Sequence, residues 1–208
     1  MSQAADITVC IATIPPRVNE LARAVKSVTR QTLQPMSIII EYDHGKTGAP
    51  ATKNRAIAKA TTEWVAMLDD DDEFLPHHLQ ALHTTALSTG ADVVYSIPHI
   101  PQIPGNRDPD GRYGVPFDAD ELRRRSYIQT TSLVRRELFM SVGGFQVPKG
   151  LMGPDDHRAN YDDWGGWLAM LDAGAKFVHC PEVTFVWNHW GFGRPGRPGN
   201  TSGRADRW

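Results

Sequence analysis

Short apolar runs alternate with helical periodicity over the first 97 residues, and this alternation restricts the possible folds more than any other feature of the sequence. Residues 7–13, 36–42 and 64–68 are apolar runs typical of strands buried in a parallel sheet. The segments between them, residues 18–28 and 49–60, have the pattern of helices. Strands that alternate with helices of this length form βαβ units with right-handed crossovers. The first half is therefore predicted to be an α/β layer.

The alternation continues beyond this half with one interruption. Residues 98–117 contain five prolines and three glycines without periodicity, which predicts a long loop that acts as a lid or a substrate-binding insertion. The other predicted helices cover residues 76–89, closed by Gly90, a short segment that ends at Ser141, and residues around 163–173. The other predicted strands cover residues 92–97, 128–134, 176–179 and 183–189.

No composition shift marks a linker, so residues 1–208 are predicted to form a single domain. Its parts would be a first half (residues 1–97), a second half (98–190) and a flexible tail (191–208) rich in Gly, Arg and Pro. With 40% apolar residues, a chain of this length can bury a substantial core.

The charge balance and the apolar runs limit the class of protein. Lys and Arg number 22 against 24 Asp and Glu, and the net charge of −2 argues against a globally basic binder of nucleic acid. No run approaches the roughly 18 apolar residues that span a bilayer, and the start of the chain lacks a signal-peptide pattern. We therefore expect a cytoplasmic protein without a membrane partner. Cys10 and Cys180 lie in apolar runs and are expected to be buried free thiols.

Five consecutive carboxylates, residues 69–73, follow the third predicted strand. Ligands of open α/β sheets bind beyond the carboxyl ends of the strands, so this is a predicted functional position. A divalent cation would relieve the mutual repulsion of the carboxylates, and Mg²⁺ or Mn²⁺ commonly uses one or two carboxylates together with phosphate oxygens. A solvated acidic turn that caps the helix beginning at Pro76 is the alternative interpretation.

Five motifs in chain order resemble those of family 2 glycosyltransferases with the GT-A fold. They are Ala12-Thr13-Ile14-Pro15-Pro16-Arg17, Gln31-Thr32, Asp43-His44-Gly45-Lys46, Thr52-Lys53-Asn54, and Leu68-Asp69-Asp70-Asp71-Asp72 followed by Pro76. The resemblance implies a Rossmann-like, mostly parallel central sheet flanked by helices, with a smaller mixed subsheet on the acceptor side. It also implies that the first half binds a nucleotide sugar and that the second half carries the acceptor site and the catalytic residue.

The resemblance also implies roles for individual residues. Thr13 and Asp43 would line the base and ribose pocket, Asp69 would face the ribose, and Asp71 would bind a Mn²⁺ or Mg²⁺ ion that bridges the diphosphate. The full nucleotide-sugar-binding set that it implies is Thr13, Arg17, Asp43, Lys53, Asp69 and Asp70. His44 stands where relatives carry an acid that contacts the base, which leaves the nucleotide open.

Two landmarks in the second half point to the chemistry. Gly143-Gly144-Phe145 and Asp162-Asp163-Trp164 resemble a turn and a helix start of the same family, which makes Asp163 the candidate general base of an inverting transfer. Such a base takes the proton of the acceptor hydroxyl as the oxygen attacks the anomeric carbon. Repulsion between the adjacent Asp162 and Asp163 and partial burial near Trp164 would raise the pKa and strengthen the base. A helix cap is the alternative role.

His189 follows the last predicted strand and is a second candidate metal ligand, with a packed or acceptor-stacking residue as the alternative. The basic tail beyond it carries Arg194, Arg197, Arg204 and Arg207. It would either close over a diphosphate or serve as a solubilising terminus.

The predicted function is a metal-dependent, inverting glycosyltransferase that uses a nucleotide-diphosphate sugar, with a UDP-sugar favoured. The acceptor stays open among a protein, a modified DNA base, a glycan and a small molecule. A nucleotidyltransferase is one alternative, although its triphosphate needs a glycine-rich loop after the first strand and residues 13–17 contain no glycine. A catalytically inactive nucleotide-sugar-binding protein is the other.

Overall fold

A single seven-stranded sheet organises the chain in the computed structural model, which describes residues 4–101, 113–146 and 162–188. The strand order is β2-β1-β3-β6-β5-β7-β4. The strands are β1 (Ala5–Thr13), β2 (Pro35–Tyr42), β3 (Trp64–Asp69), β4 (Glu73–Phe74), β5 (Val93–His99), β6 (Ser132–Arg135) and β7 (Phe177–Val186).

The first three strands form the predicted parallel unit. β1 pairs in parallel with β2 on one side and with β3 on the other. The other strands are mixed: β6 runs antiparallel to β3 and β5, β7 is parallel to β5, and β4 is antiparallel to β7. The α/β class and the mostly parallel core predicted from the sequence are confirmed, and the mixed strands continue the same sheet.

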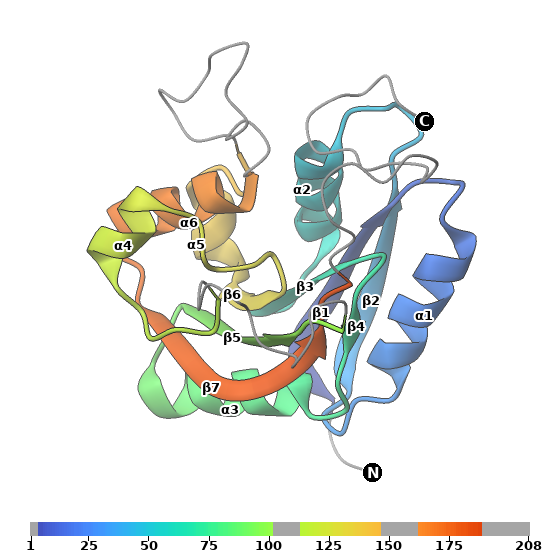
Figure 1. The fold of residues 1–208 in the computed structure, drawn as a ribbon. Coiled ribbons are helices and arrows are strands. Elements are labelled where there is room, and N and C mark those ends of the chain that lie inside the picture. Colours follow the sequence, from blue (N-terminus) through green and yellow to red (C-terminus); the bar gives the residue numbers. More distant parts are fainter. Residues whose placement is uncertain (1–3, 102–112, 147–161, 189–208) are drawn as a thin grey trace.

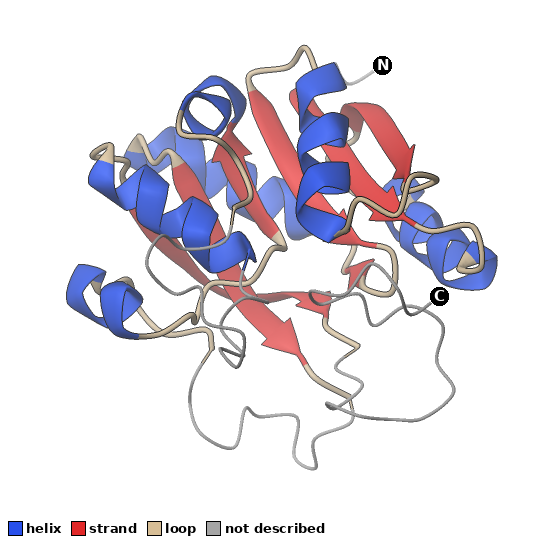
Figure 2. Ribbon diagram, turned by 90° about the horizontal axis from the view of Figure 1, so that it is seen from above, coloured by secondary structure: helices blue, strands red, loops and turns tan. Residues whose placement is uncertain are grey.

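Helices cover both faces of this sheet (Figures 1 and 2). They are α1 (Val18–Thr29), α2 (Ala49–Lys59), α3 (His78–Thr89), α4 (Ala119–Arg124), α5 (Arg136–Ser141) and α6 (Asp162–Asp172). On one face, α1 and α3 pack with β1 and β3 around residues such as Leu21, Leu82 and Trp64. On the other face, α2, α4, α5 and α6 pack around Ile57, Phe139 and Trp167. The two cores fix the sheet from both sides.

Several elements differ from the sequence prediction. β7 is one continuous strand, because the chain passes Pro181 in a bulge where His179 to Val183 lies opposite Tyr95 to Ile97. The two-residue β4 and the six-residue α4 were not predicted, because such short elements have no periodicity. β2 was predicted to be buried but lies at the edge of the sheet, where Met36, Ile40 and Tyr42 on one face are exposed and the residues of the other face are half-buried.

The state of the two cysteines agrees with the prediction from the sequence. Cys10 and Cys180 are buried and free, and burial raises the pKa of the Cys10 thiol to about 12. Among the helices that the structure describes, none has the length and apolar character needed to cross a bilayer.

Helix α2 packs closely against the turn that contains Gly144 and Phe145. The side chain of Asn54 donates to the carbonyl of Phe145 and accepts from its N–H, both at 2.9 Å. Gly144 has a φ of +65°, and a Cβ at this position would lie 2.4 Å from Asn54 Oδ1. The turn therefore requires glycine both for its backbone conformation and for the close approach of α2.

Gly144→Ala is expected to destabilise the fold by about 2–4 kcal/mol, because it adds a steric clash to the cost of a left-handed backbone. Gly90→Ala is the matched control, since Gly90 has a φ of +67° and open space around its Cβ position. We expect this control to cost only about 1 kcal/mol. Urea unfolding of both variants measures the difference, and equal losses would contradict a clash at Asn54.

Candidate active site

The carboxyl ends of β1, β2 and β3 lie side by side and carry the predicted site. Thr13 ends β1, Asp69 ends β3, and Asp43 directly follows β2. The N–H of Asp43 donates to the carbonyl of Thr13 at 2.9 Å. Parallel pairing thus brings together three polar residues that are far apart in the sequence, at the edge where α/β sheets bind ligands.

The acidic turn, Asp69 to Asp72, follows β3 and alternates between half-buried and buried side chains. Asp70 is buried. It accepts a hydrogen bond of 2.6 Å from Thr13 Oγ1 and forms an ion pair with Arg17. Burial raises the pKa of Asp70, and the charge of Arg17 opposes this effect. Arg17 also lies 3.5 Å from a carboxylate oxygen of Asp71. Asp70 therefore anchors the turn to β1, while the half-buried Asp69 and Asp71 remain at the edge.

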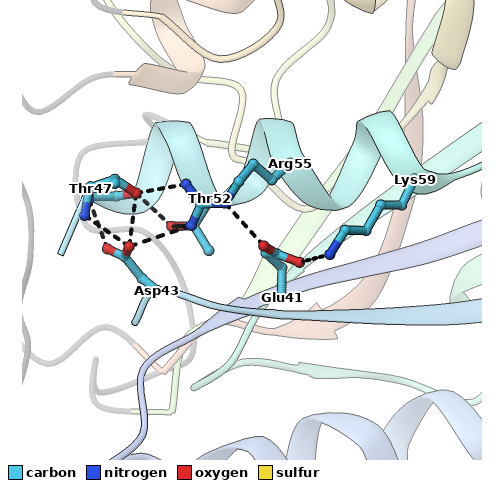
Figure 3. A network of polar contacts seen from close by, with 7 residues as sticks. Glu41, Asp43, Thr47, Thr52, Arg55 and Lys59 are labelled. Carbon is cyan, nitrogen blue, oxygen red and sulfur yellow. Dashed lines mark hydrogen bonds and ion pairs between the residues drawn. The ribbon is translucent and has the colours of Figure 1, made fainter. Parts of the chain in front are cut away.

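Asp43 organises the loop between β2 and α2 (Figure 3). Its carboxylate accepts hydrogen bonds of 2.8 Å from the N–H and hydroxyl of Thr47 and from the N–H of Gly48. Burial works to raise the pKa of Asp43, but these hydrogen bonds lower it below its ordinary value. Arg55 bridges Asp43 to Glu41 in the same network. Asp43 is therefore an anionic anchor of this loop at the predicted pocket.

Lys53 connects the two halves of the site. Its buried Nζ lies 3.0 Å from Asp69 Oδ1, 3.3 Å from Thr130 Oγ1 and 3.8 Å from Asp162 Oδ2. It also lies over the ring of Phe145, 5.2 Å from the centroid. Burial alone would lower the pKa of Lys53, but the charges of Asp69, Asp162 and Asp163 raise it above its ordinary value. Lys53 is therefore held as a cation among carboxylates from β3 and α6.

The two carboxylates that begin α6 have different surroundings. Asp163 Oδ1 accepts a hydrogen bond of 2.7 Å from the N–H of Trp164. In the part of the chain that the structure describes, no hydrogen-bond donor reaches Asp162 Oδ2. Burial, followed by the charge of Asp162, raises the pKa of Asp163 to about 7. An increase in the pKa of Asp163 was predicted from the sequence. A carboxylate with a pKa near 7 is suited to accept a proton near neutral pH.

The chemistry of the acidic turn fits a divalent cation. Asp71, with Asp69 nearby, offers carboxylate oxygens at the edge of the sheet, which are ligands that Mg²⁺ and Mn²⁺ accept. Within residues 4–101, 113–146 and 162–188, no group of three His, Cys, Asp or Glu side chains is arranged to hold a metal. Mg²⁺ and Mn²⁺ bound by one or two carboxylates usually also take phosphate oxygens from the ligand. His189 lies outside the described residues.

Comparison with known proteins assigns the family. A model of glycosyl transferase family 2 matches residues 38–147, more than half of the chain. The chain belongs to this family. The matched residues include most of β2, α2, the acidic turn and the Gly144 turn, so the predicted family and the class of enzyme are confirmed. A relative from Bacillus subtilis (strain 168), described as the uncharacterized glycosyltransferase YwdF, is 28% identical, and the alignment covers 84% of this chain and 72% of the relative.

Solved structures of glycosyltransferases share the fold. Residues 1–349 of TarS from S. aureus match with a TM-score of 0.64 at 13% identity, over 88% of this chain and 60% of that chain. The mannosyltransferase PcManGT from Pyrobaculum calidifontis, solved with GDP-Man and Mn²⁺, matches with a TM-score of 0.56 at 16% identity, over 89% of this chain and 57% of that chain. The chain thus spans about 60% of the length of the TarS chain that it matches.

Three residues in this region were not predicted as part of the site. Thr130 contacts Lys53, and Asn188 contacts both Asp71 and Asp72. Asp72 belongs to the acidic run, but the sequence alone does not indicate which carboxylates of that run are buried. Thr130 and Asn188 carry no motif, because each reaches the site through contacts between distant segments.

Proposed function

We propose that the chain is a metal-dependent, inverting glycosyltransferase that transfers a sugar from a nucleotide-diphosphate donor to an acceptor hydroxyl, with Asp163 as the general base. The observation that carries this proposal is the position of Lys53 between Asp69 and Asp162. One buried ammonium group thus links the strand end expected to hold the donor to the pair of carboxylates expected to activate the acceptor. A direct displacement requires the donor and the base to be held close together, and this contact supports such an arrangement.

The reaction follows from the chain's own residues. Asp163, unprotonated above a pKa of about 7, accepts the acceptor O–H proton as the oxygen bonds to the anomeric carbon. The bond from that carbon to the diphosphate oxygen breaks from the opposite side, and the electron pair leaves with the nucleoside diphosphate. Lys53 holds the carboxylates of Asp69 and Asp162 in place through ion pairs, and Arg17 adds positive charge beside the acidic turn.

A divalent cation held by Asp71 would supply charge neutralisation for the leaving diphosphate. The orientation of the turn supports this role, because Thr13 and Arg17 bind Asp70 and leave the half-buried Asp71 at the site. Mn²⁺ accompanies GDP-Man in the PcManGT structure, which supports the choice of Mn²⁺ or Mg²⁺.

The donor is proposed to be a UDP-sugar that occupies the ends of β1, β2 and β3 near Thr13, Asp43 and Asp69. TarS structures with UDP and with UDP-GlcNAc support this choice. We also propose one catalytic domain, with the donor half in residues 1–97 and the acceptor half in 98–190, because one sheet runs through both. A nucleotidyltransferase is less well supported, since no glycine lies in the β1–α1 turn to cradle a triphosphate.

The donor proposal predicts metal-dependent binding. Calorimetry with uridine, guanosine and thymidine diphosphate sugars should find a UDP-sugar that binds at least about tenfold more tightly with Mn²⁺ than with EDTA. Asp71→Asn should lose this gain and keep the metal-free affinity. Glu73→Gln removes a carboxylate from the same acidic run and serves as the matched control, with the gain retained. Failure of every nucleotide sugar to bind the wild-type chain would refute the donor site.

A further inference from the structure

Asn188 makes two hydrogen bonds to the acidic turn. Its backbone N–H donates to Asp72 Oδ1 at 2.9 Å, and its side-chain Nδ2 donates to the carbonyl oxygen of Asp71 at 2.7 Å. Asn188 lies two residues beyond the end of β7, more than 100 residues away from the turn in the sequence. One residue therefore binds two consecutive positions of the segment that carries the proposed metal ligand.

The turn is held from two sides. Thr13 and Arg17 bind the carboxylate of Asp70 on the side of β1, and Asn188 binds the carboxylate of Asp72 on the side of β7. The N–H of Asp72 donates to the carbonyl of Asp69 at 3.1 Å and closes the turn. Asp70 and Asp72 are each 3% exposed, whereas Asp69 and Asp71 are half-buried. Anchoring the two buried carboxylates therefore fixes the direction of the other two.

The sheet also holds Asn188 in position. β4 pairs with the end of β7, with Glu73 opposite Val186 and Phe74 opposite Phe185. The N–H of Trp187 donates to the carbonyl of His99 at 2.8 Å. Because these contacts determine where the chain leaves β7, the two hydrogen bonds of Asn188 extend the rigidity of the sheet to the backbone of Asp71.

The burial of Asp72 suggests that this contact does more than stabilise the fold. Burying a carboxylate near Asp69 and Asp71 is costly, and an apolar side chain usually stabilises a purely structural position better. A buried carboxylate at this position is explained if it helps to hold a neighbouring metal-binding side chain within about 0.5 Å of its working position. Hydrogen bonds behind a metal ligand typically change metal affinity by about 10–100-fold.

We propose that Asn188 is a positioning residue for the divalent cation: it holds the carbonyl of Asp71 and the carboxylate of Asp72, and thereby orients the Asp71 side chain toward the donor diphosphate. This inference rests on the proposed function. In this role Asn188 acts through Asp71 and is not itself assigned as a ligand of the cation.

The test measures Mn²⁺ binding without turnover. Mn²⁺ is titrated into the chain with saturating UDP, and free Mn²⁺ is followed by electron paramagnetic resonance. Asn188→Ala, which keeps the backbone bond to Asp72 and loses the bond to Asp71, should bind Mn²⁺ about 10–100-fold more weakly. Gln80→Ala removes an exposed amide from α3 and is the matched control, with unchanged affinity. Urea unfolding without Mn²⁺ should give Asn188→Ala nearly wild-type stability.

Each outcome distinguishes the inference from the function on which it rests. If the wild-type chain binds no Mn²⁺ with UDP, both are refuted. If the wild type binds Mn²⁺ and Asn188→Ala binds it equally well, the positioning role is wrong and the proposed function stands. A loss of stability with unchanged Mn²⁺ affinity likewise assigns Asn188 a structural role only. Should the alanine variant not fold, Asn188→Ser, whose hydroxyl is too short to reach the Asp71 carbonyl, takes its place with the same expected loss.

Discussion

Asp163→Asn is expected to lower turnover by about 10²–10⁴-fold while nucleotide-sugar affinity changes little. Asparagine cannot accept the acceptor proton, but its side-chain oxygen can still accept the hydrogen bond from the N–H of Trp164. Donor binding is measured by calorimetry and turnover by nucleoside diphosphate release. Asp172→Asn makes the same change at the exposed end of α6 and should leave both quantities unaltered. Equal turnover in Asp163→Asn and the wild type would remove the base assignment.

The pKa of Asp163 adds two pH dependences to this prediction. Because the base must be ionised, kcat/KM of the wild type should rise as pH increases through about 7 and level off above it. The folded protein also binds more protons than the unfolded chain between the ordinary aspartate pKa and about 7, so this group lowers stability as pH rises through that range. Asp163→Asn should therefore be more stable than the wild type at pH 8, and the difference should disappear near pH 4.

Lys53→Met is expected to destabilise the fold by about 3–5 kcal/mol at pH 8, because it leaves the buried Oδ2 of Asp162 and the half-buried Asp69 without their cation. The carboxylates of Asp69 and Asp162 lose this partner directly, and the charge of Asp163 is no longer opposed. Lys53 opposes the rise in the pKa of Asp162 and Asp163, so without it these two carboxylates bind protons more readily in the folded variant, and the loss should be smaller at pH 5 than at pH 8. Urea unfolding at both values measures the effect.

Lys59→Met is the matched control for this experiment. Lys59 lies on the same helix and pairs with Glu41, but its side chain is 58% exposed. An exposed pair contributes about 0–1 kcal/mol, so the control should remain close to the wild type at both pH values. Lys53→Arg keeps the charge and should recover part of the lost stability. If Lys53→Met loses no more than Lys59→Met, the ion pairs do not hold the two halves of the site together.

The parallel half of the fold could be predicted from the sequence because its elements are long and periodic. β1, β3, α1 and α2 each have an apolar pattern that determines their type. The half-exposed edge position of β2 could not be predicted, since its run of isoleucines resembles a buried strand. β4 is only two residues long, and its pairing with β7 defines it.

The candidate site was predictable where neighbouring residues form a motif. The position of Thr13, Asp43 and Asp69 at adjacent strand ends follows from parallel pairing. The hydrogen bonds of Asp43 within its own loop were not predicted, although an Asp followed by Thr47 and Gly48 is a local turn signal. The contacts of Lys53 with Thr130 and of Asn188 with Asp72 depend on long-range packing, which no local pattern encodes.

The stereochemistry of sugar release tests the central claim most directly. A UDP-sugar with an α-linkage is incubated with the chain and Mn²⁺, and water takes the place of the acceptor. Proton NMR should detect the β-anomer of the free sugar first, at a rate that falls strongly in Asp163→Asn. Initial release of the α-anomer, or an equal rate in Asp163→Asn, would contradict an inverting transfer with Asp163 as its base.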